Sequence, residues 1–211
     1  SAANGARDAS FNVIYGAHDQ GSPSSLTSVS SLALQPDGKV VVGGAFFGFN
    51  NVDTNMLARV TNTGANDATF IGNLGDGLQP ALAGSYCDVL DLLVQNDGKI
   101  LVGGSFDTAS GSSLPDMVRY SGAGVLDTLF VPPLGPSLGV QSFSLQPDGK
   151  VVVGLNGAGN SSGVSNAVRR FFTSMPAQPS VVQFAATAVS GDEGTNAMLT
   201  VSRTGGSLGA I

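Results

Sequence analysis

Three stretches of the chain share one alternation of apolar and polar residues, a polar turn and then a continuous apolar run. Before each turn the last two apolar residues are two positions apart, the period of a strand with one buried face. These pairs are Leu32 and Leu34, Leu92 and Val94, and Phe143 and Leu145. After the turn come three consecutive aliphatic residues, which suit a strand covered on both faces. The pattern therefore predicts β-hairpins near residues 29–46, 89–106 and 140–157.

The residues between the paired strands favour a tight turn. Proline presets φ, aspartate suits the next position, and glycine accepts the left-handed backbone that follows. The first and third turns read Pro-Asp-Gly, and the second turn has Asn96 in place of the proline. We expect a structural role for the turn residues Asp37, Gly38, Asp97, Gly98, Asp148 and Gly149.

The hairpins belong to a longer repeat, because the residues that follow them also recur. The copies open at Gln35, Gln95 and Gln146, so they are 60 and then 51 residues apart. Each copy continues into a strand that carries an arginine, and the first two copies then reach Gly-x-x-Asp-x-x-Phe at 64–70 and 124–130. Four strands in about 50 to 60 residues is the size of one β-propeller blade. The sequence therefore predicts an all-β chain with three propeller blades.

The chain also opens with a spare piece of this repeat. Segment 5–11 has the pattern Gly-x-x-Asp-x-x-Phe, which the third copy lacks after Arg169. Three blades do not close a ring, since propellers typically have four to eight. We predict either further blades in a longer chain or a homo-oligomer, with a dimer of six blades favoured. Segment 5–11 would then complete the blade of Arg169, most simply in another chain, with Phe11 near Val168 or Arg169.

On these motifs, residues 1–172 resemble the delta-60 repeat, a bacterial repeat marked by QPDGK-[VI]-x-V-G-G-x-F and D-x-[ST]-F. The third copy departs from the pattern, with Leu155 where the second glycine is expected. The resemblance implies a propeller-like fold in large secreted or surface-attached bacterial proteins. It implies no defined chemistry.

A proline-containing linker at 173–180 separates the repeats from a different tail at 181–211. The tail, through its stretches 182–184, 189–194 and 197–206, resembles the opening strands of a Calx-beta domain, an immunoglobulin-like sandwich. A complete sandwich has about 100 residues, so we expect an incomplete β-sandwich-like segment that docks on the propeller or pairs with a neighbouring chain. Asp192 and Glu193 stand where calcium-binding members carry an acidic ligand. Calcium needs six to eight oxygens, and a solvated turn is the alternative.

Composition narrows the classes of function. The net charge of −6 and the pI near 4.4 argue against nucleic acid and anionic membranes as partners. No run of 18 apolar residues is present, so no membrane insertion is expected. Cys87 is the only cysteine, which excludes a disulfide framework within the chain, and we expect it to be a small buried hydrophobe. Calcium is the only cofactor candidate.

Two repeated pairs and one histidine are the remaining candidates for chemistry. Arg59 and Arg119 each stand eight residues before an aspartate, Asp67 and Asp127. We interpret the pairs as structural ion pairs that orient strands; the alternative is a polar ring that binds an anionic or sugar ligand. The only histidine, His18, has no Gly-x-Ser-x-Gly motif elsewhere to support a catalytic triad.

The preferred hypothesis is a non-catalytic extracellular bacterial module that acts as a scaffold or adhesive surface for a glycan or a surface protein. One alternative is a hydrolase with its site in the central cleft of an oligomeric propeller, where paired carboxylates would act. The other is a calcium-stabilised carbohydrate-binding module.

Overall fold

The computed structural model describes residues 5–19, 27–79, 87–114, 116–132, 134, 138–157 and 168–172, together with the backbone strands 181–184 and 201–204. The chain divides into two compact units, Ser1–Phe171 and Phe172–Ile211. Strands dominate the described residues, and their only helix has seven residues. The predicted all-β class is therefore confirmed. None of the described helical residues forms a span suited to crossing a membrane.

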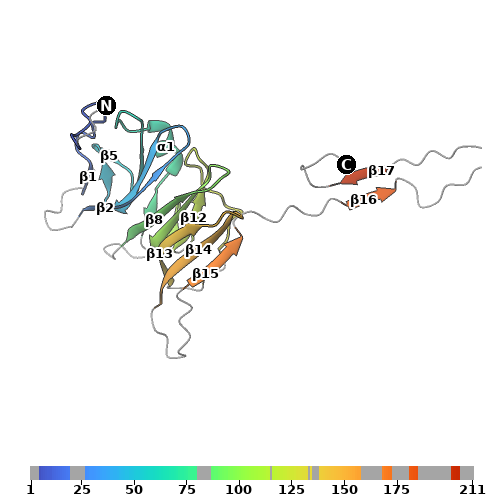
Figure 1. Cartoon of the computed structure of the whole chain (residues 1–211). Helices are drawn as coiled ribbons and strands as arrows, with labels where there is room; N and C mark the ends of the chain where they lie inside the picture. Colours follow the sequence, from blue (N-terminus) through green and yellow to red (C-terminus); the bar gives the residue numbers. More distant parts are fainter. Residues whose placement is uncertain are drawn as a thin grey trace, which may run out of the picture. The chain divides into compact units, whose positions relative to one another are not determined.

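Each predicted hairpin forms the first two strands of a three-stranded antiparallel sheet (Figure 1). The first sheet contains β2 (Ser28–Leu34), β3 (Val40–Ala45) and β6 (Leu57–Val60). The second contains β8 (Asp88–Val94), β9 (Ile100–Ser105) and β12 (Met117–Tyr120). The third contains β13 (Leu138–Leu145), β14 (Lys150–Gly157) and β15 (Val168–Phe172). The strand after the turn lies in the middle of each sheet, which explains its continuous apolar run.

The three turns have the same geometry. Their glycines have positive φ angles of 83°, 80° and 79° at Gly38, Gly98 and Gly149. In each turn the aspartate Oδ1 accepts a hydrogen bond at 3.1 Å from the backbone N–H of the lysine two residues later. The aspartate therefore closes the turn, and the glycine supplies a conformation that other residues rarely adopt.

Consecutive sheets stack face to face. Strand β8 lies beside both β2 and β13, so the first strands of the three sheets are neighbours. A Cβ atom placed on Gly43 of β3 would lie 2.5 Å from Cγ1 of Val89, and one on Gly103 of β9 would lie 2.6 Å from Cζ of Phe143. Side chains of each following sheet thus fill the space left by a glycine in the preceding sheet. We call Gly43, Gly103 and their equivalent Gly154 the glycine sockets.

The core of the first unit lies between the sheets. One cluster joins the first two sheets and includes the fully buried Val41, Leu57, Phe70, Ile100 and Tyr120. A second cluster joins the second and third sheets. Its buried members are Leu101, Met117, Val140, Val151, Val153 and Leu155. Full burial of such a side chain contributes about 1.5–3 kcal/mol, so the packing of side chains between the sheets stabilises the unit.

The prediction of a fourth strand, at the Asp-x-x-Phe segment, is wrong for the first two repeats. The strand is reduced to a single bridge, between Val60 and Asn66 in the first repeat and between Tyr120 and Leu126 in the second. Asp67 then caps the helix α1 (Ala68–Leu74), because its Oδ1 accepts a hydrogen bond from the backbone N–H of Phe70 at 3.3 Å. Aspartate is a favoured helix N-cap, so the residue read as part of a strand starts a helix instead.

Two small sheets flank the first and second large sheets. One contains β1 (Ala17–His18), β4 (Gly48–Phe49) and β5 (Val52–Asp53). The other contains β7 (Leu78–Gln79), β10 (Thr108–Ala109) and β11 (Ser112–Ser113). Strand β1 pairs with β4 as β7 pairs with β10. The N-terminal segment therefore meets the first sheet as the segment around α1 meets the second.

In the second unit, β16 (Val181–Phe184) pairs antiparallel with β17 (Val201–Thr204). The resemblance to a Calx-beta domain placed strands in these two stretches. Asp192 and Glu193 lie outside the described residues.

Candidate functional site

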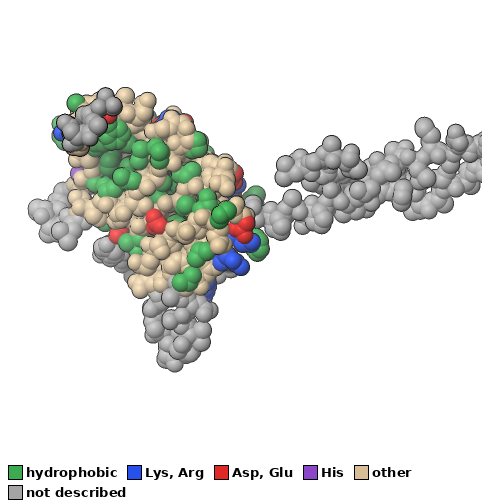
Figure 2. All heavy atoms as spheres, in the orientation of Figure 1, with side chains coloured by type: hydrophobic (Ala, Val, Ile, Leu, Met, Phe, Trp, Pro, Cys, Tyr) green, Lys and Arg blue, Asp and Glu red, His purple; other side chains and the backbone are tan. Residues whose placement is uncertain are grey.

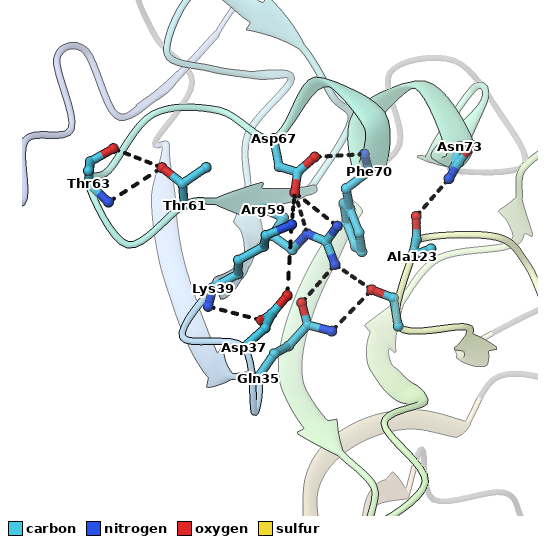
Figure 3. Close-up of polar contacts among 11 residues, drawn as sticks. Gln35, Asp37, Lys39, Arg59, Thr61, Thr63, Asp67, Phe70, Asn73 and Ala123 are labelled. Carbon is cyan, nitrogen blue, oxygen red and sulfur yellow. Dashed lines mark hydrogen bonds and ion pairs between the residues drawn. The ribbon is translucent and has the colours of Figure 1, made fainter.

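The arginine of strand β6 is the centre of a polar cluster (Figure 3). Oδ2 of Asp67 lies 3.2 Å from the Arg59 Nε and 2.9 Å from its Nη2. The Arg59 guanidinium carbon also lies 4.4 Å from the centre of the Phe70 ring. The buried guanidinium is thus stabilised by a carboxylate in its plane and an aromatic face beside it.

The same arginine reaches the next sheet. Its Nη1 donates to Oε1 of Gln35 at 2.9 Å and also to the carbonyl oxygen of Gly122. The Gln35 side chain donates to that carbonyl as well, from Nε2 at 3.1 Å. Gly122 belongs to the turn that follows β12 of the second sheet. The cluster of Arg59, Asp67, Gln35 and Phe70 therefore fixes the position of the second sheet on the first.

The second repeat contains an equivalent cluster. Oδ2 of Asp127 lies 2.9 Å from the Arg119 Nε and 2.8 Å from its Nη2. The guanidinium carbon is 4.4 Å from the centre of the Phe130 ring, as in the first cluster. We call the two groups the arginine clusters. Both predicted pairs, eight residues apart in sequence, are thus in contact in the structure.

A turn lysine completes each arginine cluster. The Lys39 ammonium donates to Oδ2 of Asp67 at 2.8 Å, and the Lys99 ammonium donates to Oδ2 of Asp127 at 3.0 Å. Each lysine thus links the turn of a hairpin to the segment that follows the third strand of the same repeat.

The environment keeps both cluster aspartates ionised. Burial by itself would raise the pKa of Asp67, but the Lys39 ammonium, the Phe70 N–H and the Arg59 charge outweigh it and lower the pKa to about 2. At Asp127 burial likewise favours a higher pKa, but hydrogen bonds from Lys99 and Arg119 outweigh it and lower the pKa. A carboxylic acid with a lowered pKa is a poor proton donor at neutral pH. These aspartates therefore suit ion pairing better than general acid catalysis.

In the third sheet, the turn lysine has a different partner. The Lys150 ammonium pairs with Asp148 of its own turn, and this hydrogen bond lowers the pKa of Asp148. Arg169 lies in β15 at the position of Arg59 and Arg119, half-buried. No Asp-x-x-Phe follows it in the sequence. The third repeat therefore has an arginine at the equivalent position, but its sequence lacks the motif that supplies the aspartate and phenylalanine of the clusters in the first two repeats.

An aspartate that sequence reasoning missed joins all three sheets. Asp91 lies at the β-bulge of β8, where the pairing register with β9 shifts. Its Oδ1 accepts from the Ser31 hydroxyl at 3.0 Å, and its Oδ2 accepts from the backbone N–H of Phe143 at 2.7 Å. The signal in the sequence is that Ser31, Asp91 and Ser142 occupy equivalent polar positions inside apolar strands.

The only histidine and the only cysteine of the sequence both contact other parts of the fold. His18 forms part of β1, and its Nδ1 is 3.5 Å from the carbonyl oxygen of Gly16. Within the described residues no serine hydroxyl bonds to its ring. Cys87 is partly buried and packs against the core of the first two sheets. Burial, followed by the nearby charges of Asp107, Asp88 and Asp116, raises the Cys87 pKa to about 12, so the group is a thiol at neutral pH.

No described group of three or more His, Cys, Asp or Glu side chains could hold a metal ion. This leaves the calcium hypothesis untested, because its candidate ligands Asp192 and Glu193 are outside the described residues.

Comparison with known proteins points to the same repeat. A family model described as "Domain of unknown function (DUF5122) beta-propeller" matches residues 35–70 and 95–130. Each matched stretch runs from the glutamine to the phenylalanine of one repeat. No curated protein and no solved structure matches the chain. Together with the stacked antiparallel sheets, the match identifies a propeller-like repeat protein.

Proposed function

We propose that this propeller-like region is a non-catalytic scaffold that presents a binding surface for a glycan or a surface protein outside a bacterial cell. The observation that carries the proposal is the contact between Arg59 and the Gly122 carbonyl of the next sheet. The repeated charged residues, which were the main candidates for ligand binding, thus bind neighbouring parts of the fold. The extracellular, bacterial setting is taken from the resemblance of the repeats to delta-60 proteins.

The surface fits a scaffold that meets a neutral or weakly charged partner. Charged residues are only 11% of the chain. Figure 2 shows that on the face turned to the viewer, charged side chains are sparse and hydrophobic side chains reach the surface between them. Long-range electrostatic attraction is correspondingly small, so recognition on this face would depend on contact and hydrogen bonds.

An activity screen separates the scaffold from a hydrolase. The chain would be incubated with nitrophenyl glycosides, nitrophenyl esters and a casein substrate, beside an Asp91→Asn variant. Asp91 is the control because its carboxylate joins the neighbouring first strands of all three sheets. We expect no turnover with either protein. Turnover by the wild type that the variant loses, at an unchanged melting temperature, would contradict the scaffold role.

A binding measurement addresses the scaffold directly. Soluble xylan, chitosan and alginate, passed over the immobilised chain with 1 mM CaCl₂ or with EGTA, would reveal a carbohydrate surface and its calcium dependence. Binding that survives EGTA supports the scaffold role. Binding that EGTA abolishes favours the calcium-stabilised module instead.

A further inference from the structure

Among the described residues, no sheet packs on one face of the first sheet or on one face of the third sheet, whereas the second sheet has a neighbouring sheet on both sides. In β8 the side chains of Val89 and Leu92 are 0% and 6% exposed, because they fill the socket at Gly43. The equivalent residues of β2 are in the open. Val29, Leu32 and Leu34 are 45%, 63% and 69% exposed. The exposed side chains of β2 thus occupy the same positions, and are of the same apolar kind, as the side chains of β8 that fill the socket at Gly43.

The third sheet has the complementary feature. A Cβ atom on Gly154 would meet only Ser142 of its own sheet, whereas one on Gly43 or Gly103 would meet side chains of the following sheet. The outer strand of this sheet is open too. All four residues of β6 and of β12 are buried, but Val168 and Phe172 of β15 are 66% and 69% exposed. The stack therefore ends in a glycine socket without an occupant among the described residues.

The N-terminal segment lies where a preceding sheet would leave its outer segment. Phe11 packs on the first sheet against a cluster that includes Val42, Ala58 and Val60. Phe70 packs on the second sheet in the same way, against Val118 and Tyr120. Phe70 also has Arg59 of the preceding sheet over its ring. Phe11 has no arginine over its ring among the described residues, and it stays half-buried.

Asp8, the acidic residue of this segment, also differs from its equivalents in the other two repeats. The Asp8 carboxylate accepts hydrogen bonds from the Ser10 N–H at 2.9 Å and from the Ser10 hydroxyl at 2.6 Å. Among the residues that the structure describes, it forms no ion pair with a lysine or arginine. Asp67 and Asp127 each form two. The segment is thus preformed as the acidic and aromatic side of an arginine cluster.

We propose that a second copy of this chain joins the two open faces in a head-to-tail contact. The β2 face of one copy fills the Gly154 socket of the other. Asp8 and Phe11 of the first copy then meet Lys150 and Arg169 of the second, which forms a third arginine cluster between the chains. A contact between two different faces is heterologous, and it closes into a ring when the rotation permits. Two copies supply six sheets, a number within the range of closed propellers.

The contact is independent of the proposed scaffold role, because it concerns how copies meet and not what their surface binds. The exposed Leu32 and the uncovered Gly154 allow each half of the contact to be removed separately. Leu32→Lys places a charge on the β2 face, and Gly154→Ala fills the socket. Each substitution leaves the other half intact, so a mixture of the two variants retains one complete contact per pair of chains.

The experiment measures mass in solution by sedimentation at about 1 to 100 μM chain. We expect the wild type to form a dimer or a larger closed species, and each variant alone to associate at least about tenfold more weakly. An equimolar mixture of the two variants should form dimers again. Leu129→Lys and Gly72→Ala are the controls, since Leu129 is 92% exposed and a Cβ atom on Gly72 would meet nothing. Circular dichroism checks that every variant is folded.

A second variant tests the N-terminal segment. Asp8→Asn should weaken association about tenfold, as expected for loss of one partner of a charge pair that becomes buried in a contact. A wild type that sediments as single chains across this range would overturn the proposal. So would Leu32→Lys and Gly154→Ala variants that associate as strongly as the wild type, or a mixture that stays monomeric while the wild type dimerises.

Discussion

The second sheet and the first sheet contain the same hairpin in two different environments. Leu92 of β8 is buried against the Gly43 socket, while Leu32 of β2 is exposed. The apolar residues have the same spacing in the two hairpins, and the two turns have the same geometry although Asn96 replaces Pro36. The difference lies in the neighbour, because of these two sheets only the second packs on a preceding sheet among the described residues. The repeat therefore encodes a contact between sheets as much as the sheet itself.

The largest expected effect comes from truncating the two equivalent leucines. Leu92→Ala should lower the free energy of unfolding by about 3 kcal/mol, because it leaves a cavity between the first two sheets. Leu32→Ala should change it by less than about 0.5 kcal/mol, as is usual for exposed positions. Urea denaturation, at a chain concentration low enough for sedimentation to show single chains, would measure both values. Equal losses would show that the two hairpins do not differ in their surroundings.

The glycine sockets offer the same comparison with a side chain added. Gly103→Ala should cost about 2 kcal/mol, because the new Cβ meets Phe143 of the third sheet and forces the sheets apart. Gly154→Ala meets only the Ser142 side chain, which can rotate away, so we expect a loss below about 1 kcal/mol. Melting temperatures followed by circular dichroism, again at a concentration where sedimentation shows single chains, would rank the two variants. A larger loss at Gly154 would contradict the assignment of an open socket.

Local sequence patterns were sufficient to predict the hairpins, because a Pro-Asp-Gly turn and a period of two act within about ten residues. They also predicted the contact of Arg59 with Asp67, since the same pair recurs at the same spacing. The Arg59 contact with Gly122 was beyond their reach. It joins residues 63 apart through a backbone carbonyl, which has no signature in side-chain identity.

The errors have physical causes too, and these differ from one element to the next. Asp67 was read as part of a fourth strand, although aspartate followed by Ala-Thr-Phe is also a good helix start. The small sheets have strands of two residues, too short for any period to be recognised. Asp91 was overlooked because a polar residue inside an apolar strand is explained only by the bulge that turns it toward its neighbours.

The arginine clusters should make the free energy of unfolding depend on pH. Because the folded pKa of Asp67 is about 2, below its ordinary 3.8, its ionised form stabilises the fold above pH about 4. That contribution should be lost as the pH falls from about 4 to about 2. Asp67→Asn keeps an N-cap acceptor but has no charge to titrate. Its free energy of unfolding should therefore fall less over this range.

Urea denaturation at pH 2.5, 4 and 6 would measure this effect, and Asp127→Asn provides the equivalent change in the second repeat. The two variants should behave alike, since the pKa of both aspartates is lowered by a lysine and an arginine. Parallel slopes for the wild type and both variants would show that the clusters do not contribute to acid stability.

The smallest expected effect tests whether α1 belongs to the first repeat as a stable element. Gly72 lies inside this helix, and a Cβ atom placed on it would meet no other atom within 4 Å. Gly72→Ala should therefore raise the free energy of unfolding by about 0.5–1 kcal/mol, because alanine loses less backbone entropy in a helix. Thermal unfolding against the wild type would detect the change. The second repeat has a turn in place of this helix, with Phe130 N–H bonded to the Asp127 carbonyl oxygen at 3.1 Å. If Gly72→Ala gives no gain, the first repeat holds Phe70 through a similar turn. The helix would then add nothing to the packing between the first two sheets.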